Sequence, residues 1–309
     1  MSKHPSWRPV RAPEPLGFRQ QHPVFTAMIP IGLVMIALVT MVVIKTTGGS
    51  ASASGRSSAA STGRATVSGN GTTALAAGVL SDVTSVSAAT LAQVGNPGSL
   101  ADPVKVSGSP NVLEGADGKP EILYIGAEYC PFCAAERWAV VEALSRFGSF
   151  SGLSATHSST SDVYPTTQTF SFYGSTYSSP YFDFVPVEEE TNQAVGSGYA
   201  TLQTPTASEQ KLLNTYDTSP YSSTPGSIPF LDIGNRFIVA GASYTPAVLQ
   251  GLTMSQIAAQ LNDPSSVVAQ AIDGTANLIT ASICAITGDQ PASVCGTPTI
   301  SGIAKKLGA

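Results

Sequence analysis

The chain has 309 residues, enough for one or two domains with a hydrophobic core. Its formal net charge is −5, which gives no indication of a nucleic-acid partner. Only 11% of the residues are charged, well below the roughly 25% of typical soluble domains, and Ser, Thr, Gly and Ala take their place. A polar but weakly charged surface of this kind is compatible with an extracytoplasmic protein.

The N-terminal part contains a long apolar run. Residues 24–44, VFTAMIPIGLVMIALVTMVVI, have no ionisable side chain and follow a tail, 1–23, that we expect to be unstructured. At about 1.5 Å per residue such a helix spans a hydrocarbon core of about 30 Å, so we predict a transmembrane helix. A buried core helix of this length would have a polar face. A cleaved signal peptide is the main alternative, although its apolar region is usually about 7–15 residues long.

The flanking cations predict how this span is oriented. More cations precede it closely than follow it, which favours a cytoplasmic N-terminus. The preceding cations are Lys3, Arg8, Arg11 and Arg19. We therefore expect a single-pass protein of the cell membrane. Residues 45–75 are rich in Gly, Ser, Ala and Thr and predict a flexible linker to an extracytoplasmic domain, 76–309, where disulfides persist.

The first half of this domain predicts two helices and a strand. Residues 85–95 read as a short helix with Ser87 as its N-cap. The β-rich apolar run EILYIGA, 121–127, predicts a buried strand. Residues 131–150 carry apolar side chains at helical spacing, and Gly148 ends this helix.

The second half predicts more strands and helices, and together these give a mixed α/β fold. Strands are expected at 153–159, 168–173 and 181–188, two more within 228–243 joined by a tight Gly234-Asn235 turn, and helices at 207–216 and over 253–286 with a break at 262–264. We interpret residues of about 159–227 as an insertion into the domain.

Two of the four cysteines, Cys130 and Cys133, stand between the predicted strand and helix. The first turn of a helix offers unpaired N–H groups and the positive end of its dipole, which favour a thiolate and lower the cysteine pKa. A strand–C-x-x-C–helix order in an α/β pattern is typical of a thiol redox centre. We expect Cys130, facing solvent, to be the nucleophile, and Cys133, shielded one turn later, to be the resolving thiol.

Other readings of the cysteine pair remain open. A structural disulfide is one of them. A zinc site would need two further ligands, yet His157 is the only histidine after the apolar run. We therefore expect no metal and no cofactor. Cys284 and Cys295 enclose a turn-rich ten-residue loop and predict a structural disulfide, with a second redox pair that relays electrons to Cys130 as the alternative.

Several neighbours of the pair are further candidates. Tyr129 and Phe132 flank the cysteines and suggest an apolar rim for unfolded substrates. Glu128 is either a proton relay or a solvated loop residue, and its charge disfavours a thiolate. Arg137 either stabilises a thiolate or, as we expect, forms a surface salt bridge. Trp138 is expected in the core.

A proline in the second half supports the redox reading. In GSIPFLDIG, Pro229 follows Ile228 at the start of a predicted strand. Thioredoxin-like folds place a cis-proline at such a strand start, opposite the cysteine pair, where the preceding residue offers backbone groups to an extended substrate. Ile-Pro bonds are otherwise mostly trans, so the order of the two motifs carries the argument.

The chain resembles the thioredoxin-like family catalogued as domain of unknown function 929 (DUF929). The similar stretches are residues 118–150, 169–188, 227–244 and 276–295, and the resemblance covers roughly 80–309. It implies a thioredoxin-like fold, a redox pair at Cys130 and Cys133, and a cis-proline at Pro229. It says less about activity, because no settled activity belongs to the family.

Two functions follow as expectations. The leading one is a membrane-tethered, extracytoplasmic thiol–disulfide oxidoreductase that acts on client proteins with thiols or disulfides and is recycled by an unknown membrane redox partner. The alternative is a non-catalytic extracytoplasmic binding module on a thioredoxin-like scaffold, with residues 159–227 as its partner surface. An exposed Cys130 of low pKa favours the enzyme, and a buried or unreactive one favours the module.

Overall fold

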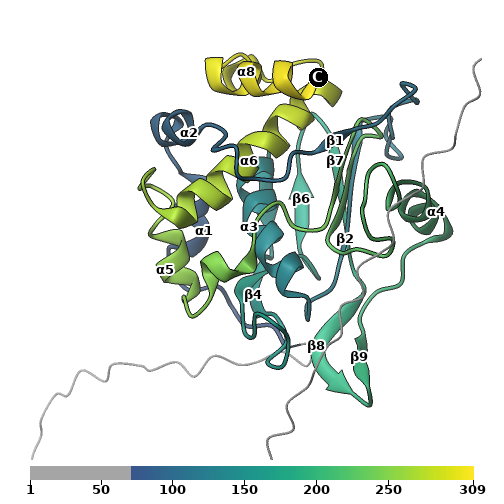
Figure 1. Cartoon of the computed structure of the whole chain (residues 1–309), viewed down its shortest axis with the longest axis vertical. Helices are drawn as coiled ribbons and strands as arrows, with labels where there is room; N and C mark the ends of the chain where they lie inside the picture. Colours follow the sequence, from purple (N-terminus) through teal and green to yellow (C-terminus); the bar gives the residue numbers. More distant parts are fainter. Residues whose placement is uncertain (1–70) are drawn as a thin grey trace, which may run out of the picture. The chain divides into compact units, whose positions relative to one another are not determined.

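A mixed five-stranded sheet forms the centre of the part of the chain that the structure, a computed structural model, describes: residues 71–309 (Figure 1). Its strand order is β1 (Val104–Lys105), β11 (Phe237–Ala240), β10 (Phe230–Ile233), β2 (Glu121–Gly126) and β7 (Asp183–Glu188). β2 and β7 are parallel, and the other neighbours are antiparallel. The tail 1–23, the apolar span 24–44 and almost all of the linker 45–75 lie outside the described residues.

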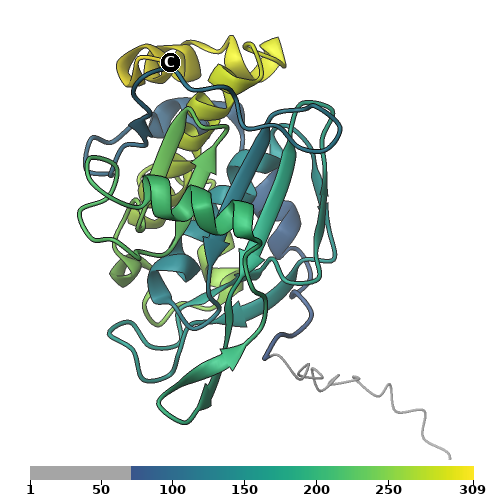
Figure 2. The same ribbon diagram turned by 90° about the vertical axis from the view of Figure 1, so that its right-hand side faces the viewer.

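Helices cover both faces of this sheet. One face carries the long helices α3 (Pro131–Ser145) and α6 (Val267–Ile286) with α1 (Val79–Thr84), α2 (Ala88–Val94), η1 (Pro246–Leu249), α5 (Met254–Ala258), α7 (Ala292–Cys295) and α8 (Pro298–Leu307) around them. The opposite face carries α4 (Ala207–Tyr216), which lies across the sheet in Figure 2. The sheet is therefore buried on both sides, as the apolar runs in β2 and β10 require.

Three small two-stranded sheets complete the fold. They pair β3 (Ser149–Ser151) with β6 (Thr176–Ser178), β4 (Ser154–His157) with β5 (Gln168–Ser171), and β8 (Glu190–Val195) with β9 (Gly198–Thr201). The β8–β9 hairpin projects at the end of the molecule opposite α8 (Figure 1). It was not predicted from the sequence, because its strands are polar and carry no apolar alternation.

The local predictions hold where local chemistry decides the structure. β2 and α4 lie where they were expected, and the Ser87 hydroxyl caps α2 by accepting the Thr90 N–H at 3.0 Å. Helix α3 ends at Ser145 rather than near 150. The chain turns into β3 at Gly148, where a side chain would collide with the carbonyl oxygen of Ser178.

The range 159–227 is not a single insertion. It contains β7, which is hydrogen-bonded to β2 along its whole length within the main sheet. The sequence analysis predicts a strand at 181–188 but does not assign this strand to the main sheet, because the apolar residues alone do not show which strand it pairs with. The parts of 159–227 that lie outside the main sheet include the β8–β9 hairpin and the long connections on either side of α4.

Helix α6 is the core helix of the fold. Within residues 71–309 it is the one helix that is long and apolar enough to cross a membrane, judged by length and composition only. However, 89% of its most apolar window is buried inside the fold, against α3, α2 and α8. Its apolar character is therefore explained by packing.

Cys284 and Cys295 form a disulfide that joins the end of α6 to α7. The two cysteines are 11 residues apart in the sequence and both are buried. We predict that replacing both with serine lowers the free energy of unfolding by about 2–3 kcal/mol, because a loop of this length loses closure entropy when it is cross-linked. Chemical denaturation measures this change. An unchanged midpoint would contradict a structural role for this bond.

Asp232 in β10 predicts a pH dependence of stability. Its carboxylate is fully buried, it accepts the Asn235 N–H at 2.7 Å, and burial raises its pKa from 3.8 to about 7. The folded state therefore holds the proton up to higher pH than the unfolded state, so this stabilisation is complete below about pH 4 and lost as the pH rises through 7. Glu136 and Glu188, also raised to about 7, act in the same direction.

We predict that the free energy of unfolding is larger at pH 5 than at pH 8, and that Asp232→Asn reduces this difference by about 1–3 kcal/mol. Denaturation at both pH values measures the effect. The exposed Asp82→Asn variant is the control and should leave the difference unchanged. Equal pH dependence in wild type and Asp232→Asn would show that Asp232 ionises normally in the folded protein.

Candidate functional site

Cys130 caps the first turn of α3. It follows the end of β2, and its sulfur accepts the backbone N–H of Cys133 at 3.2 Å. Pro131 occupies the first helical position, where no N–H is needed. The Cys130 sulfur also lies 3.7 Å from the carbonyl oxygen of Ile228. The sequence order of strand, cysteine and helix thus positions one thiol at the positive end of a helix.

The two thiols have opposite electrostatic surroundings. The pKa of Cys130 is lowered, and the largest cause is its side-chain hydrogen bond with Cys133. Burial acts in the opposite direction, whereas the Cys133 N–H and the charge of Arg137 lower the pKa further. The pKa of Cys133 is raised well above its usual value, because the thiol is fully buried and shares that hydrogen bond. Both thiols are free in the structure. The difference favours a thiolate at Cys130 and a thiol at Cys133.

Cys130 does not face solvent as expected. Only 5% of its surface is exposed, and it belongs to a small apolar cluster with Ala127, Cys133, Tyr129 and Ile228. The sequence argument considered the helix end alone, whereas the neighbouring strand and loop cover the sulfur. These covering residues would have to move before another molecule could reach the Cys130 sulfur.

Ile228 and Pro229 lie beside the cysteines because β10, which they precede, pairs with β2. β10 runs antiparallel to β2, with Phe230 opposite Ile125, so the start of β10 lies beside the end of β2. The Ile228–Pro229 peptide bond is cis. The resemblance implied this cis bond, and the carbonyl oxygen of Ile228 lies 3.7 Å from the Cys130 sulfur.

Aromatic side chains surround the cysteines in two pairs. Tyr129 stacks on Tyr199 of β9 at 4.2 Å between ring centroids, with only 4° between the planes. Phe132 is 39% exposed and meets the edge of Tyr164 at 5.9 Å. Tyr199 also donates to the Ser159 hydroxyl at 2.7 Å. Sequence reasoning missed Tyr164 and Tyr199, because nothing in their spacing relates them to residues about 30–70 positions earlier.

Arg137 lies in the core, and the predicted surface salt bridge is wrong. Its guanidinium is fully buried and forms a two-bonded pair with Glu188 of β7 at 2.8 and 2.6 Å. It also donates to the carbonyl of Ala127 at 2.8 Å. The arginine thus ties the loop before Cys130 to the edge strand of the sheet. The prediction failed because α3 is enclosed on all sides.

Glu128 is also buried rather than solvated. It accepts a hydrogen bond from the Ser171 hydroxyl, and its second oxygen has no partner within residues 71–309. Burial raises the pKa of Glu188 to about 7, while Arg137 acts to lower it and Glu128 to raise it further. One cation and two acids therefore share a buried cluster beside the cysteines.

Residues 103–285 match the family described as Domain of unknown function (DUF929), which is more than half of the chain. The chain belongs to the DUF929 family. No curated protein and no solved structure matches it. The matched DUF929 region includes the cysteine pair, the buried Arg137–Glu188 ion pair and Ile228, whereas Cys295 lies beyond it.

The described part of this DUF929 protein contains no group of three or more His, Cys, Asp or Glu side chains placed to hold a metal ion.

The buried ion pair predicts a strong coupling between two elements. We expect Glu188→Gln to lower the free energy of unfolding by about 3 kcal/mol or more, because it removes the counterion to which the buried Arg137 charge is hydrogen-bonded. The double variant Arg137→Met, Glu188→Met should be more stable than Glu188→Gln, since neither charge of the pair remains. Denaturation of both variants tests this. Equal losses in the two would contradict the role of the pair.

Proposed function

We propose that this DUF929 protein is a thiol–disulfide oxidoreductase that acts on protein thiols through Cys130 and Cys133. The observation that supports it most is the asymmetry of the pair. Cys130 accepts the Cys133 N–H at the start of α3 and has a lowered pKa, while Cys133 is fully buried with a raised pKa. A nucleophilic thiolate beside a protonated resolving thiol suits stepwise disulfide exchange.

The topology supports a thioredoxin-like core for this chemistry. The strand before the cysteines, β2, lies between a parallel neighbour, β7, and an antiparallel one, β10. The helix that follows the cysteines packs on one face of the sheet, and α4 packs on the other. The cysteine pair follows the end of β2, and the Ile228–Pro229 bond precedes the start of β10 beside it. This is the order that the family resemblance implies.

In the reducing direction, the Cys130 thiolate attacks a client disulfide. A bond forms between Cys130 and one client sulfur, and the other client sulfur leaves as a thiolate that takes up a proton. Cys133 then loses its proton and attacks the Cys130 sulfur, which closes the Cys130–Cys133 disulfide and releases the second client thiol. Two electrons pass from the pair to the client, and the reverse sequence oxidises client thiols. The relative reduction potentials decide the direction.

The residues around the pair have matching roles in this proposal. The backbone of Ile228, 3.7 Å from the Cys130 sulfur, is positioned to bind an extended client segment next to the reacting sulfur. Phe132 is the exposed aromatic side chain beside the pair, and Tyr129 lies between the cysteines and the β8–β9 hairpin. We assign both aromatics to an apolar client-binding rim.

We further propose that the domain is tethered to the cell membrane by residues 24–44, with the N-terminus in the cytoplasm and the DUF929 domain outside it. The uncharged apolar run and the cations before it support the span. The Cys284–Cys295 disulfide supports the compartment, because such bonds persist outside the cytoplasm. A membrane redox partner would then recycle the cysteine pair.

A second function is favoured by one observation. Cys130 is only 5% exposed, and a cysteine that clients never reach would make the domain a non-catalytic binding module. In that case the exposed Phe132 and the β8–β9 hairpin would bind a partner without thiol exchange. The two functions differ in whether a covalent intermediate forms.

Trapping of mixed disulfides distinguishes them. We predict that Cys133→Ser, expressed as the full-length chain in membranes, accumulates mixed disulfides with client proteins, because attack by Cys130 continues and release by Cys133 is lost. Non-reducing electrophoresis followed by reduction measures these adducts. Cys130→Ser, which keeps the same fold and the same disulfide at Cys284 and Cys295, should trap almost none.

Two results would overturn the proposal. Equal trapping by both variants, or trapping by Cys130→Ser alone, would reverse the roles of the two cysteines. No trapping by either variant, together with a Cys130 that resists alkylation near neutral pH in the folded protein, would favour the binding module.

A further inference from the structure

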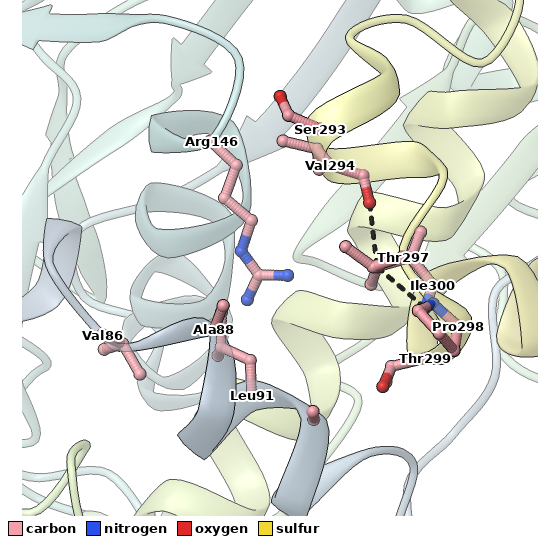
Figure 3. Close-up of a pocket in the computed structure, with 11 residues that line it drawn as sticks. Val86, Ala88, Leu91, Arg146, Ser293, Val294, Thr297, Pro298, Thr299 and Ile300 are labelled. Atoms are coloured by element: carbon pink, nitrogen blue, oxygen red, sulfur yellow. Dashed lines mark hydrogen bonds between the residues drawn. The ribbon is translucent and has the colours of Figure 1, made fainter.

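A cavity lies at the end of α3 far from the cysteines. Its volume is about 490 Å³, it is open to solvent on one side, and it is lined by α2, the end of α3, α7 and the start of α8 (Figure 3). This volume falls within the range of about 300–1,000 Å³ that is typical of small-molecule sites. The cavity takes no part in the proposed thiol chemistry, and nothing argued about it depends on that proposal.

The walls of this cavity are mainly apolar. They include Val86, Leu91 and Ala92 from α2 and its approach, and Val294, Pro298 and Ile300 from α7 and α8. An apolar cavity that contains few polar groups selects ligands by shape and by the position of those groups. The polar groups present therefore decide which ligand fits.

Arg146 is the one charged residue that lines the cavity. Figure 3 shows its guanidinium extending into the space between α2 and Thr297. Three of its hydrogen bonds fix it from behind, to Asn277, Thr280 and Glu142 at 2.9, 2.9 and 2.6 Å. Its Nε has no partner within the described part of the chain, but this atom is buried and is not exposed to the cavity. The three bonds use both N–H groups of Nη1 and one of Nη2, so the arginine is rigidly held and retains a donor at Nη2.

The N-terminus of α8 opens onto the same cavity. This ten-residue helix begins at Pro298, and Thr297, Pro298 and Thr299 all line the space. A helix N-terminus carries a partial positive charge. In α8, Pro298 has no N–H and the Thr297 hydroxyl accepts the Ile300 N–H at 3.4 Å, so Thr299 supplies the remaining N–H of the first turn. Arg146 and this helix end together offer positive charge and hydrogen-bond donors, which match a ligand group that is anionic and accepts hydrogen bonds.

We propose that this cavity binds a small apolar molecule that ends in a carboxylate, such as a medium-chain fatty acid. The apolar walls from α2 and α7 hold the chain or ring, and Arg146 with the start of α8 binds the carboxylate. A carboxylate accepts hydrogen bonds only, so it suits a site whose charged group is solely a donor.

The acidic residues behind Arg146 are compatible with an anionic ligand. Glu142 is paired with Arg146, and burial raises the pKa of its neighbour Asp273 to about 10, so Asp273 is uncharged at neutral pH. The pKa of Glu142 is also raised by burial. The cluster of Arg146, Glu142 and Asp273 therefore carries no net negative charge that would repel a carboxylate.

The Cys284–Cys295 disulfide supports the cavity wall. Cys295 lies between Val294 and Thr297, which both line the cavity, and the bond fixes this segment to the end of α6. The disulfide thus has a second consequence besides stability, because it holds one side of the site in place.

Titration calorimetry of the full-length chain in lipid nanodiscs, with octanoate as the probe, tests this proposal. We expect saturable binding of octanoate and at least tenfold weaker binding of methyl octanoate and octyltrimethylammonium, which lack the anionic acceptor. Ala92→Trp, which places a large side chain at an exposed position lining the cavity, should weaken octanoate binding at least tenfold. Arg146→Gln should do the same.

Ala207→Trp on α4 is the matched control, because Ala207 is also an exposed helical alanine but lies on the opposite face of the sheet. It should bind octanoate as the wild type does, and any uptake of octanoate by the nanodisc lipid is equal in both. The proposal fails if octanoate gives no saturable binding, if the ester or the cation binds equally well, or if Ala92→Trp binds like Ala207→Trp.

Discussion

The burial of almost the whole of helix α3, including its charged residues, is the constraint on which the rest of this structure depends. All its residues except Phe132 and Ser145 are buried, although the helix carries three charged side chains. A buried charge is tolerated only when it is paired or hydrogen-bonded. Each charge therefore has a partner: Glu136 binds Ser243 and Arg137 binds Glu188, both from distant parts of the chain, and Glu142 binds Arg146 at the end of the same helix. These pairings fix how the sheet, the connection after β11 and the end of α3 surround the helix.

The same constraint positions the cysteine pair. Arg137 connects α3 to β7 through Glu188 and to the loop before Cys130 through the Ala127 carbonyl. Because the guanidinium is held by these bonds, its charge stays at a fixed place near the first turn of the helix, where it lowers the pKa of Cys130. The ion pair costs desolvation energy, so its contribution is better described as positioning than as net stability. Any movement of β7 relative to α3 would change the surroundings of the thiols.

Sequence reasoning succeeded where neighbouring residues decide the outcome. The strand β2, the start of α3 at Cys130, the Ser87 cap and the α4 helix follow from local patterns and capping chemistry, and they lie where they were expected. It failed where burial depends on distant segments. Glu128 and Arg137 look like surface residues in the sequence, because nothing local indicates that the polar positions in and before this helix are buried together with its apolar ones. The stacking of Tyr199 on Tyr129 joins residues 70 positions apart and has no local signal.

Access to Cys130 is then controlled by the least tightly packed part of the site. In the apolar cluster around the sulfur, Ala127 and Cys133 are buried, whereas Ile228 and Tyr129 are only partly buried. Tyr129 stacks on Tyr199 of the β8–β9 hairpin. That hairpin has an irregular register between Glu190 and Ala194, and Val195 at its tip is 61% exposed. Segments with few buried apolar contacts open at lower free energy than the core. The thiols thus lie between buried core residues and the less buried segment of Tyr129 and the β8–β9 hairpin, and this segment is the one that we expect to open more readily.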